Sequence, residues 1–351
     1  MSVKVAVVRS DNGMDAALHE ALSLIGGIDD LNNGREVTVK VGIFDPRSRH
    51  HSGVDVVGAI AGVFDRSPSV LLAESDNYCG KALDRLALYD ALFDERVRPY
   101  SLSDEVDMRP VQVAGEVEAI SNALFKPNVL VSTHVLRTFA RGSILKNLFG
   151  CTPMVQKAKF HKNEIFANQL ADIAEVAGGI DLAVMDGTFL YHSAAEKCVR
   201  LDLLIVGRDA VAVETVGCLI AGLKPENSLT IQEFMLRGLG EGNTEKIEIV
   251  GIDPKEFAAL KAARKELKKL VDSAPRGPGI SDTIDCLTEE GWMDVFRTAE
   301  EVATELQQRG VKNATKTMTE TTLKRRVGKT LERAQAEGAT RGGWQYRKAQ
   351  G

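Results

Sequence analysis

The sequence predicts an α/β protein in which a mostly parallel sheet carries helices on both faces, with a helical appendage at the C-terminal end. Two observations support this fold class. Short runs of β-branched and apolar residues alternate along the chain with stretches whose apolar residues recur at helical spacing. Several runs are apolar at successive positions, which is typical of strands that are covered on both faces of a parallel sheet.

The runs are expected to form strands and the segments between them helices. The expected strands lie at residues 3–8, 36–44, 69–75, 128–133, 180–187, 201–207 and 246–251. The expected helices lie at residues 14–24, 54–64, 81–93, 164–176, 210–221 and 230–239. Ligands of such sheets bind beyond the carboxyl ends of the strands, so polar residues directly after the strands are the first candidates for a functional site.

The chain is expected to divide near residue 272. A helical stretch at 255–271 is followed by the breaker-rich segment 273–279, which is typical of a linker. We therefore expect an α/β domain at residues 1–272 and a helical appendage at 280–337, with helices at 289–308 and 315–336 and no strands. Residues 338–351 are rich in Gly and polar residues, which predicts a mobile basic tail.

Composition places the chain among ordinary globular proteins. It has 351 residues, 44% of them hydrophobic, and no run approaches the about 20 apolar residues that a membrane-spanning helix needs. The N-terminal residues read directly into a strand without a secretory signal, so a cytoplasmic location is expected. The five cysteines are scattered and form no CxxC pair, which argues against a disulfide framework and a self-contained zinc or iron–sulfur motif.

Charge is unevenly distributed. The net charge is −5, yet residues 312–351 contain ten Lys or Arg and three Glu. The acidic remainder repels nucleic acid, so only the basic segment could contact a phosphate backbone, and nucleic acid is not expected as a partner. The alternating signs in the basic segment favour a solvated helix, or one that docks a protein partner or a second copy of the chain.

Several widespread catalytic and cofactor motifs are missing. No GxGxxG follows the first strand and no GxxxxGK[ST] occurs, so a dinucleotide or P-loop nucleotide site is not indicated. GxSxG and HExxH are absent as well, which removes the simplest serine-hydrolase and zinc-protease interpretations.

Three residues are the candidates for proton transfer. His134 directly follows the expected strand at 128–133, and His161 lies further along the chain. Either histidine could move a proton at neutral pH. Asp186 ends another expected strand, where it would orient a histidine or bind a divalent cation, or simply cap a turn.

Four residues are the candidates for binding an anionic substrate. Lys40 interrupts an apolar strand, so it is either buried beside an anionic partner or alternates outward. In residues 143–150 (SILKNLFG), the turn that begins at Ser143 leads to Lys146 and Asn147. Turn N–H groups, an ammonium and an amide would together hold a carboxylate or phosphate; the alternative for Lys146 is an ordinary surface lysine.

A metal is the only cofactor that the residue pattern suggests. His50 and His51 are adjacent in an Arg-rich segment and could bind metal or be solvated, while Cys151 is either reactive or a buried inert thiol. Asp209 follows the expected strand at 201–207. Nitrogen and sulfur ligands would favour iron, nickel or zinc, and carboxylates would favour magnesium.

The order of these motifs resembles the domain of unknown function 362 family over roughly residues 1–252. The resemblance rests on Lys40, STH at 132–134, SILKNLFG at 143–150, His161, Asp186-Gly187, GRDAVAVETVG at 207–217 and GLGEG at 238–242. It implies an α/β fold, and many members also carry a ferredoxin-like iron–sulfur module, which this sequence lacks. A more distant similarity links the lysine turn and later histidine to lactate-racemase-type proteins.

Two departures from the family pattern concern the expected anion site. Ser132 stands where the family usually has lysine, and Glu214 stands where it usually has aspartate. Because no lysine stands at position 132, Lys146 is expected to make a larger contribution to anion binding.

Two functional hypotheses follow. The first is an enzyme with isomerase-like, racemase-like or metal-assisted acid–base chemistry on a small anionic molecule. The second is a metal- or iron–sulfur-associated accessory or redox protein that docks a protein partner. The remaining alternative is a purely structural interaction protein, because solvation alone can explain polar residues at strand ends.

Overall fold

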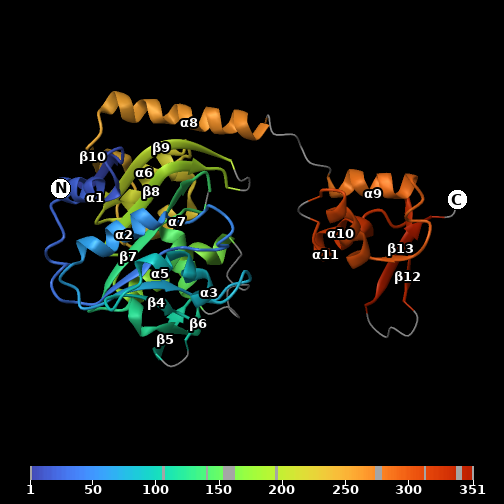
Figure 1. Cartoon of the computed structure of the whole chain (residues 1–351), viewed down its shortest axis with the longest axis horizontal. Helices are drawn as coiled ribbons and strands as arrows, with labels where there is room; N and C mark the ends of the chain where they lie inside the picture. Colours follow the sequence, from blue (N-terminus) through green and yellow to red (C-terminus); the bar gives the residue numbers. More distant parts are fainter. Residues whose placement is uncertain are drawn as a thin grey trace. The chain divides into compact units, whose positions relative to one another are not determined.

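The chain forms two compact units, Met1–Asp272 and Ser273–Gly351 (Figure 1). The computed structural model describes residues 2–104, 107–139, 141–152, 163–193, 197–272, 279–311, 314–336 and 342–349. No helix in these described ranges is long and apolar enough to cross a membrane.

An eight-stranded sheet forms the centre of the first unit. Its strands, in spatial order, are β10 (Ile247–Val250), β1 (Val3–Arg9), β9 (Cys198–Gly207), β8 (Leu182–Tyr191), β7 (Val129–Arg137), β2 (Val37–Lys40), β3 (Val70–Glu74) and β4 (Val97–Ser101). Neighbouring strands are parallel except at β9, which runs antiparallel to both β1 and β8. The expectation of a mostly parallel sheet is confirmed.

Helices cover both faces of this sheet. One face packs against α1 (Met14–Leu24), α2 (Val54–Val63), α3 (Ala82–Leu86) and the 3-10 helix η1 (Ala87–Leu92). The other packs against α5 (Asn163–Ala177), α6 (Ala210–Ile220), α7 (Leu229–Leu236) and α8 (Pro254–Asp272). Side chains alternate between two separate apolar cores, because successive residues of a strand point to opposite faces.

Smaller elements complete the first unit. A two-stranded hairpin consists of β5 (Met108–Val113) and β6 (Glu116–Ser121). The described residues also form the 3-10 segments η3 (Asn122–Leu124), η4 (Leu145–Cys151), η6 (Pro225–Asn227) and η7 (Thr244–Lys246). Neither this hairpin nor β4 was predicted from the sequence. Charged and proline residues interrupt these strands and leave no apolar run to detect.

The strand expected at 36–44 is shorter than predicted. β2 ends at Lys40, and Gly42 then turns the chain with a φ of +70°, a conformation that side-chain-bearing residues rarely adopt. The residues after Gly42 consequently leave the sheet and pass over the carboxyl ends of its strands.

The described residues of the second unit form three helices and a small antiparallel sheet. Its elements are α9 (Ile280–Glu289), β11 (Arg297–Thr298), α10 (Ala299–Gln308), α11 (Lys316–Lys324), β12 (Leu331–Gln335) and β13 (Trp344–Lys348). The helical character of this part is confirmed, but two details were wrong. Residues 331–335, expected in a helix, form β12, and residues 344–348, expected in a mobile tail, form β13 with Tyr346 fully buried. Both strands are largely polar, so they lack the usual strand pattern.

Candidate anion-binding site

A cavity of about 90 Å³ lies at the carboxyl ends of β2, β3 and β7. Its walls come from these strand ends, from the segments that follow β2 and β3, and from η4. The titratable and amide side chains that line it are Lys40, Glu74, Asn77, His134, Arg137, Lys146 and Asn147. Phe44 and Tyr78 also line it and are largely exposed.

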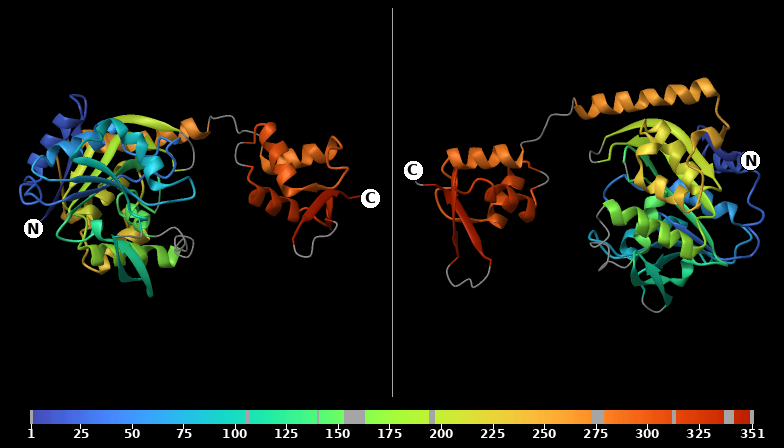
Figure 2. Two further views of the ribbon diagram at one scale, coloured as in Figure 1. Left: turned by 60° about the horizontal axis from the view of Figure 1, so that its bottom comes forward. Right: turned by 180° about the vertical axis from the view of Figure 1, so that it is seen from behind.

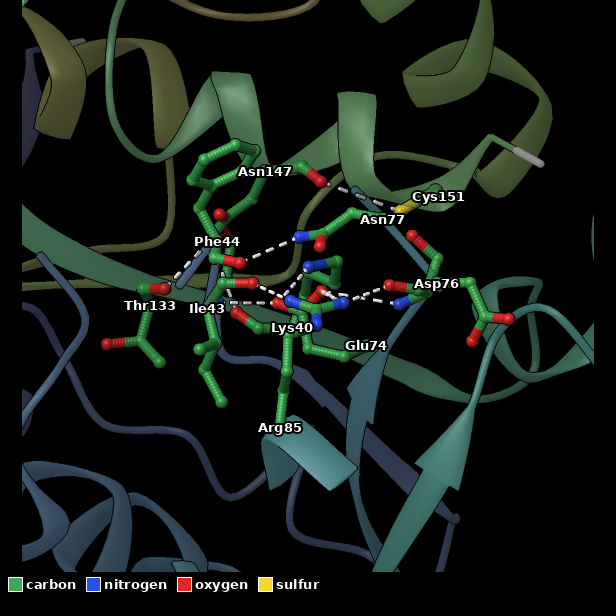
Figure 3. Close-up of polar contacts among 12 residues, drawn as sticks. Lys40, Ile43, Phe44, Glu74, Asp76, Asn77, Arg85, Thr133, Asn147 and Cys151 are labelled. Carbon is green, nitrogen blue, oxygen red and sulfur yellow. Dashed lines mark hydrogen bonds and ion pairs between the residues drawn. The ribbon is translucent and has the colours of Figure 1, made fainter. Parts of the chain in front are cut away.

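Lys40 is buried at 2% exposure, and its partner is Glu74 on the neighbouring strand β3 (Figure 3). Lys40 Nζ lies 2.6 Å from Glu74 Oε1, which also accepts a hydrogen bond of 2.7 Å from the Ile43 N–H. Arg85 reaches the same carboxylate from α3, with Nη2 3.6 Å from Oε2, and donates to the carbonyls of Ile43 and Ser75. The structure thus selects the buried alternative for Lys40 and supplies its anionic partner.

Alternation along the strands explains which residues reach the cavity. Lys40 lies opposite Ser132 across the β2–β7 pair, and His134 lies two residues further on the same face of β7. Thr133 points to the other face, where its hydroxyl hydrogen-bonds to Ser52.

Asn147 is held by backbone carbonyls instead of facing a ligand with its amide group. Its Nδ2 donates to the carbonyl oxygens of Lys40 and Thr133, at 3.2 and 2.7 Å, and to Ser132 Oγ at 3.1 Å. Both N–H bonds are therefore engaged in joining β2 to β7. This differs from the expected role, in which the Asn147 amide would donate to an anion.

The side chain of Glu214 on α6 accepts hydrogen bonds from N–H groups of the turn before Lys146. Its carboxylate accepts the Ser143 N–H at 2.9 Å and the Leu145 N–H at 3.1 Å. Burial raises the pKa of Glu214, whereas these hydrogen bonds lower it. The turn N–H groups that were expected to bind substrate thus bind Glu214, and Ser143 does not line the cavity.

His134 lines the cavity as a neutral hydrogen-bond donor. Its Nδ1 accepts the Val135 N–H at 2.8 Å, so the single proton of the neutral ring resides on Nε2. Burial holds the His134 pKa well below its usual range, and the nearby charges of Arg137, Lys146 and Lys40 lower it further. The geometry favours donation from Nε2 to an anionic oxygen over the proton abstraction that the sequence suggested.

Arg137 and Lys146 place two further cations at the cavity. Arg137 donates to Ser143 Oγ at 3.2 Å and to the Gly142 carbonyl at 3.0 Å, and the charged groups of both residues lie near the Phe139 ring. Burial lowers the pKa of Arg137 to about 10 and that of Lys146 to about 7, where Arg137 and Lys40 add to the effect. In the described part of the chain, neither side chain forms an ion pair with a carboxylate.

Arg137 was not among the sequence candidates. Strict alternation would place it on the face opposite His134, but the β7–β8 register shifts between Val135 and Arg137. Such an irregularity redirects a side chain locally. The available signal was an arginine three residues after the strand-end histidine, which alone does not indicate its direction.

Asp186 lies at the same end of the sheet but outside the cavity. It pairs across the sheet with Val135, on the face opposite His134. Its Oδ2 accepts the Gly53 N–H at 2.9 Å, and its Oδ1 accepts the N–H and hydroxyl of Thr188 at 3.0 and 2.7 Å. Burial raises its pKa. Asp186 therefore fastens the start of α2 to β8 and does not orient His134.

The four metal candidates do not come together. The His50 ring packs on Tyr191 with 5.2 Å between centroids, His51 Nδ1 lies 3.2 Å from the Ser52 carbonyl oxygen, and Cys151 is buried with Sγ 3.8 Å from the Asn147 carbonyl oxygen. Within the described ranges no group of three His, Cys, Asp or Glu could hold a metal ion. His161 lies outside the described residues.

Asp209 lies at the opposite end of the strands from the cavity, because β9 is antiparallel and not parallel as assumed. It caps α6: its Oδ1 accepts the N–H groups of Val211 and Ala212, both at 2.9 Å. Its Oδ2 accepts the Glu241 N–H at 2.8 Å, which attaches the segment 238–242 to the helix. Its role in the structure is that of a helix cap.

The fold and the site define an α/β protein with a cation-lined cavity at the carboxyl ends of parallel strands. Residues 37–219 match the family described as Domain of unknown function (DUF362), and the chain belongs to this family. The match includes every strand and turn that contributes a charged side chain to the cavity. None of the curated proteins compared with the chain matches it. The similarity to lactate-racemase-type proteins stays a prediction.

Proposed function

We propose that the first unit is an enzyme that binds a small anionic molecule in this cavity and transfers a proton through Lys146. The observation that carries the proposal is the pair of cations, Arg137 and Lys146, at a cavity where Glu74, the one carboxylate among the described lining residues, already binds Lys40. A carboxylate or phosphate group of the ligand would supply the missing negative charge.

The electrostatic argument concerns desolvation. A cation removed from water is costly unless an anion or hydrogen-bond acceptors replace the water. Arg137 has two such acceptors, Ser143 Oγ and the Gly142 carbonyl, whereas Lys146 has the face of the Phe139 ring, 5.4 Å from Nζ to the centroid. An anion between the two groups would stabilise both of their charged forms.

Lys146 has the properties of a proton-transfer group. A pKa of about 7 means that ammonium and amine are both populated at neutral pH, which suits a general acid or base. His134 would contribute its Nε2–H to an oxygen that gains negative charge during the reaction. These two roles favour an isomerase-like or racemase-like reaction, with Lys146 in place of the histidines as the titrating group.

The dimensions of the cavity restrict what enters it. A volume of about 90 Å³ holds a phosphate or a carboxylate with few further atoms. The exposed rings of Phe44 and Tyr78 would contact the remainder of a larger molecule.

The proposal is tested by calorimetric titration with inorganic phosphate, acetate and a small dicarboxylate. We expect at least one anion to bind, and its affinity to fall at least about tenfold in both Arg137→Gln and Lys146→Gln, which corresponds to loss of one charge-assisted hydrogen bond. The matched control is Lys265→Gln, which removes an exposed charge from α8. Equal affinity in the wild type and both cavity variants would contradict the proposal.

A further inference from the structure

The second unit has a recognisable order of elements. Along the chain it reads helix, strand, two helices and two strands, from α9 through β11, α10 and α11 to β12 and β13. The three strands are antiparallel in the spatial order β11-β13-β12, so the last strand lies between the other two. This is the topology of a winged helix–turn–helix, in which the second helix of the helix–turn–helix pair enters a DNA groove.

Local interactions build the helix–turn–helix. Thr298 starts α10 with a capping box to Glu301, and Gly310 ends that helix with a φ of +87°. Thr315 then caps α11 by accepting the Met318 N–H on its hydroxyl at 3.3 Å. The core that joins the helices to the hairpin contains Ile284, Leu287, Val302, Leu306, Leu323, Leu331 and Tyr346.

Among the described residues of the unit, none covers one face of α11. Thr319 and Leu323, four residues apart, point into the core. Thr317, Met318 and Thr321 lie on the exposed side of the helix. Short hydroxyl side chains and a flexible thioether can contact base edges and the thymine methyl group, which is how a recognition helix reads a major groove.

Charge is segregated within the unit. Residues 280–308 contain eight acidic residues and one arginine, whereas residues 312–351 contain ten Lys or Arg and three Glu. Lys324 at the end of α11 forms an ion pair with Glu320, and the guanidinium of Arg333 on β12 lies over the Trp344 ring. Both of these basic side chains also lie near Tyr346, so basic side chains occur on the end of the helix and on the hairpin, which Figure 2 shows extending from the helices. Arg325 and Lys329 are exposed and form no ion pair in the described part of the chain.

We infer that the second unit binds double-stranded DNA, with the exposed face of α11 in the major groove and the basic hairpin strands against the phosphate backbone. This inference departs from the sequence-based expectation that nucleic acid is not a partner, which rested on the acidic charge of the chain outside residues 312–351. It also does not depend on the function proposed for the first unit, because it uses no residue of the cavity.

The test is fluorescence anisotropy of the full chain with a labelled DNA duplex of mixed sequence, at several salt concentrations. The wild type is expected to bind, with log Kd rising linearly with log salt. Each phosphate contact contributes about 0.9 to that slope, so Arg325→Ala/Lys329→Ala should lower it by about 2 and raise Kd at least about tenfold at 0.1 M salt. Both side chains are exposed, so the double variant is expected to fold.

The matched control is Lys265→Ala/Lys268→Ala, which removes two exposed charges from α8 of the first unit. It should leave Kd and slope unchanged. The inference is overturned if the wild type does not bind the duplex, if the control weakens binding as much as Arg325→Ala/Lys329→Ala does, or if an RNA hairpin or single-stranded DNA of equal length binds more tightly than the duplex.

Discussion

Lys40 and Glu74 lie on the adjacent parallel strands β2 and β3, and 2.6 Å separates Nζ from Oε1 inside the protein. The same carboxylate also binds the Ile43 N–H and lies 3.6 Å from Arg85 Nη2. Glu74 thus compensates two buried cations and fixes the first residues of the segment that covers the cavity.

Removing Glu74 is expected to destabilise the fold strongly. Glu74→Ala leaves the Lys40 charge buried without a partner, so the free energy of unfolding should fall by about 3 to 5 kcal/mol, measured by urea denaturation. The double variant Lys40→Met/Glu74→Gln also removes the unpaired lysine charge and should recover part of the lost free energy of unfolding. A loss below about 1 kcal/mol for Glu74→Ala would be inconsistent with a structural ion pair.

Gly42→Ala should distort the cavity as well as the backbone. An added Cβ would lie 2.4 Å from Asn147 Oδ1 and 2.5 Å from His134 Cδ2, in a residue whose φ is +70°. Gly34→Ala is the matched control, because Gly34 has a φ of +88° with no atom within 4 Å of the added Cβ. We expect the control to lower the free energy of unfolding by about 1 kcal/mol, and Gly42→Ala to lower it by at least about 1 kcal/mol more. Equal losses would show that the close contacts relax freely.

Anion binding should weaken as the pH rises through about 7. Only the ammonium form of Lys146 attracts an anion, and its pKa of about 7 means that this form is fully present below pH 6 and lost above pH 8. Titration calorimetry between pH 5.5 and 9 measures the change. Lys146→Arg keeps its charge throughout this range and should lose the inflection. An inflection that persists in Lys146→Arg would assign the titration to another group.

The same pKa predicts how stability depends on pH without ligand. Between pH 7 and about 10 the unfolded chain holds the Lys146 proton and the folded chain does not, so the free energy of unfolding rises with pH. The slope in wild type should exceed that in Lys146→Gln when both are unfolded in urea. Identical slopes would mean that the folded-state pKa is unshifted.

Glu214→Ala should weaken anion binding although Glu214 does not line the cavity. Its carboxylate accepts the Ser143 and Leu145 N–H groups and thereby positions the turn that carries Lys146. We expect a loss of about 1 to 3 kcal/mol in stability, from unsatisfied buried donors, together with a lower anion affinity. Asp209→Ala removes the cap of α6 at the opposite end of the strands. It should lower the free energy of unfolding by about 1 kcal/mol and leave the anion affinity unchanged.

His134 should stay neutral through the pH range in which an ordinary histidine gains its proton. Burial and the neighbouring cations lower its pKa, and the Val135 N–H occupies Nδ1. Its ring ¹⁵N shifts should therefore be independent of pH and indicate the Nε2–H tautomer, with His19 on the exposed side of α1 as a comparison in the same spectra. Titration of His134 near its ordinary pKa would remove the argument that it acts as a donor only.

The sequence alone was sufficient to predict much of the sheet and most of the helices, since these depend on local patterns. Consecutive apolar residues marked the central strands, and Lys40 and the turn before Lys146 lay where a parallel α/β fold places ligand sites. The strands of the second unit were missed because residues such as those of β12 bury only Leu331 and give no apolar run.

Only the tertiary structure decided which residues form the site. Whether Asn147 faces a ligand or the strand ends depends on the carbonyls of Lys40 and Thr133, and whether the Ser143 turn is open depends on Glu214, 71 residues away. The direction of β9 decides at which end of the strands Asp209 lies. One register shift in β7 decides whether the Arg137 side chain reaches the cavity. Hydrogen bonds and strand directions of this kind join distant segments, so local residue patterns do not encode them; they arise when the packed sheet satisfies its buried polar groups.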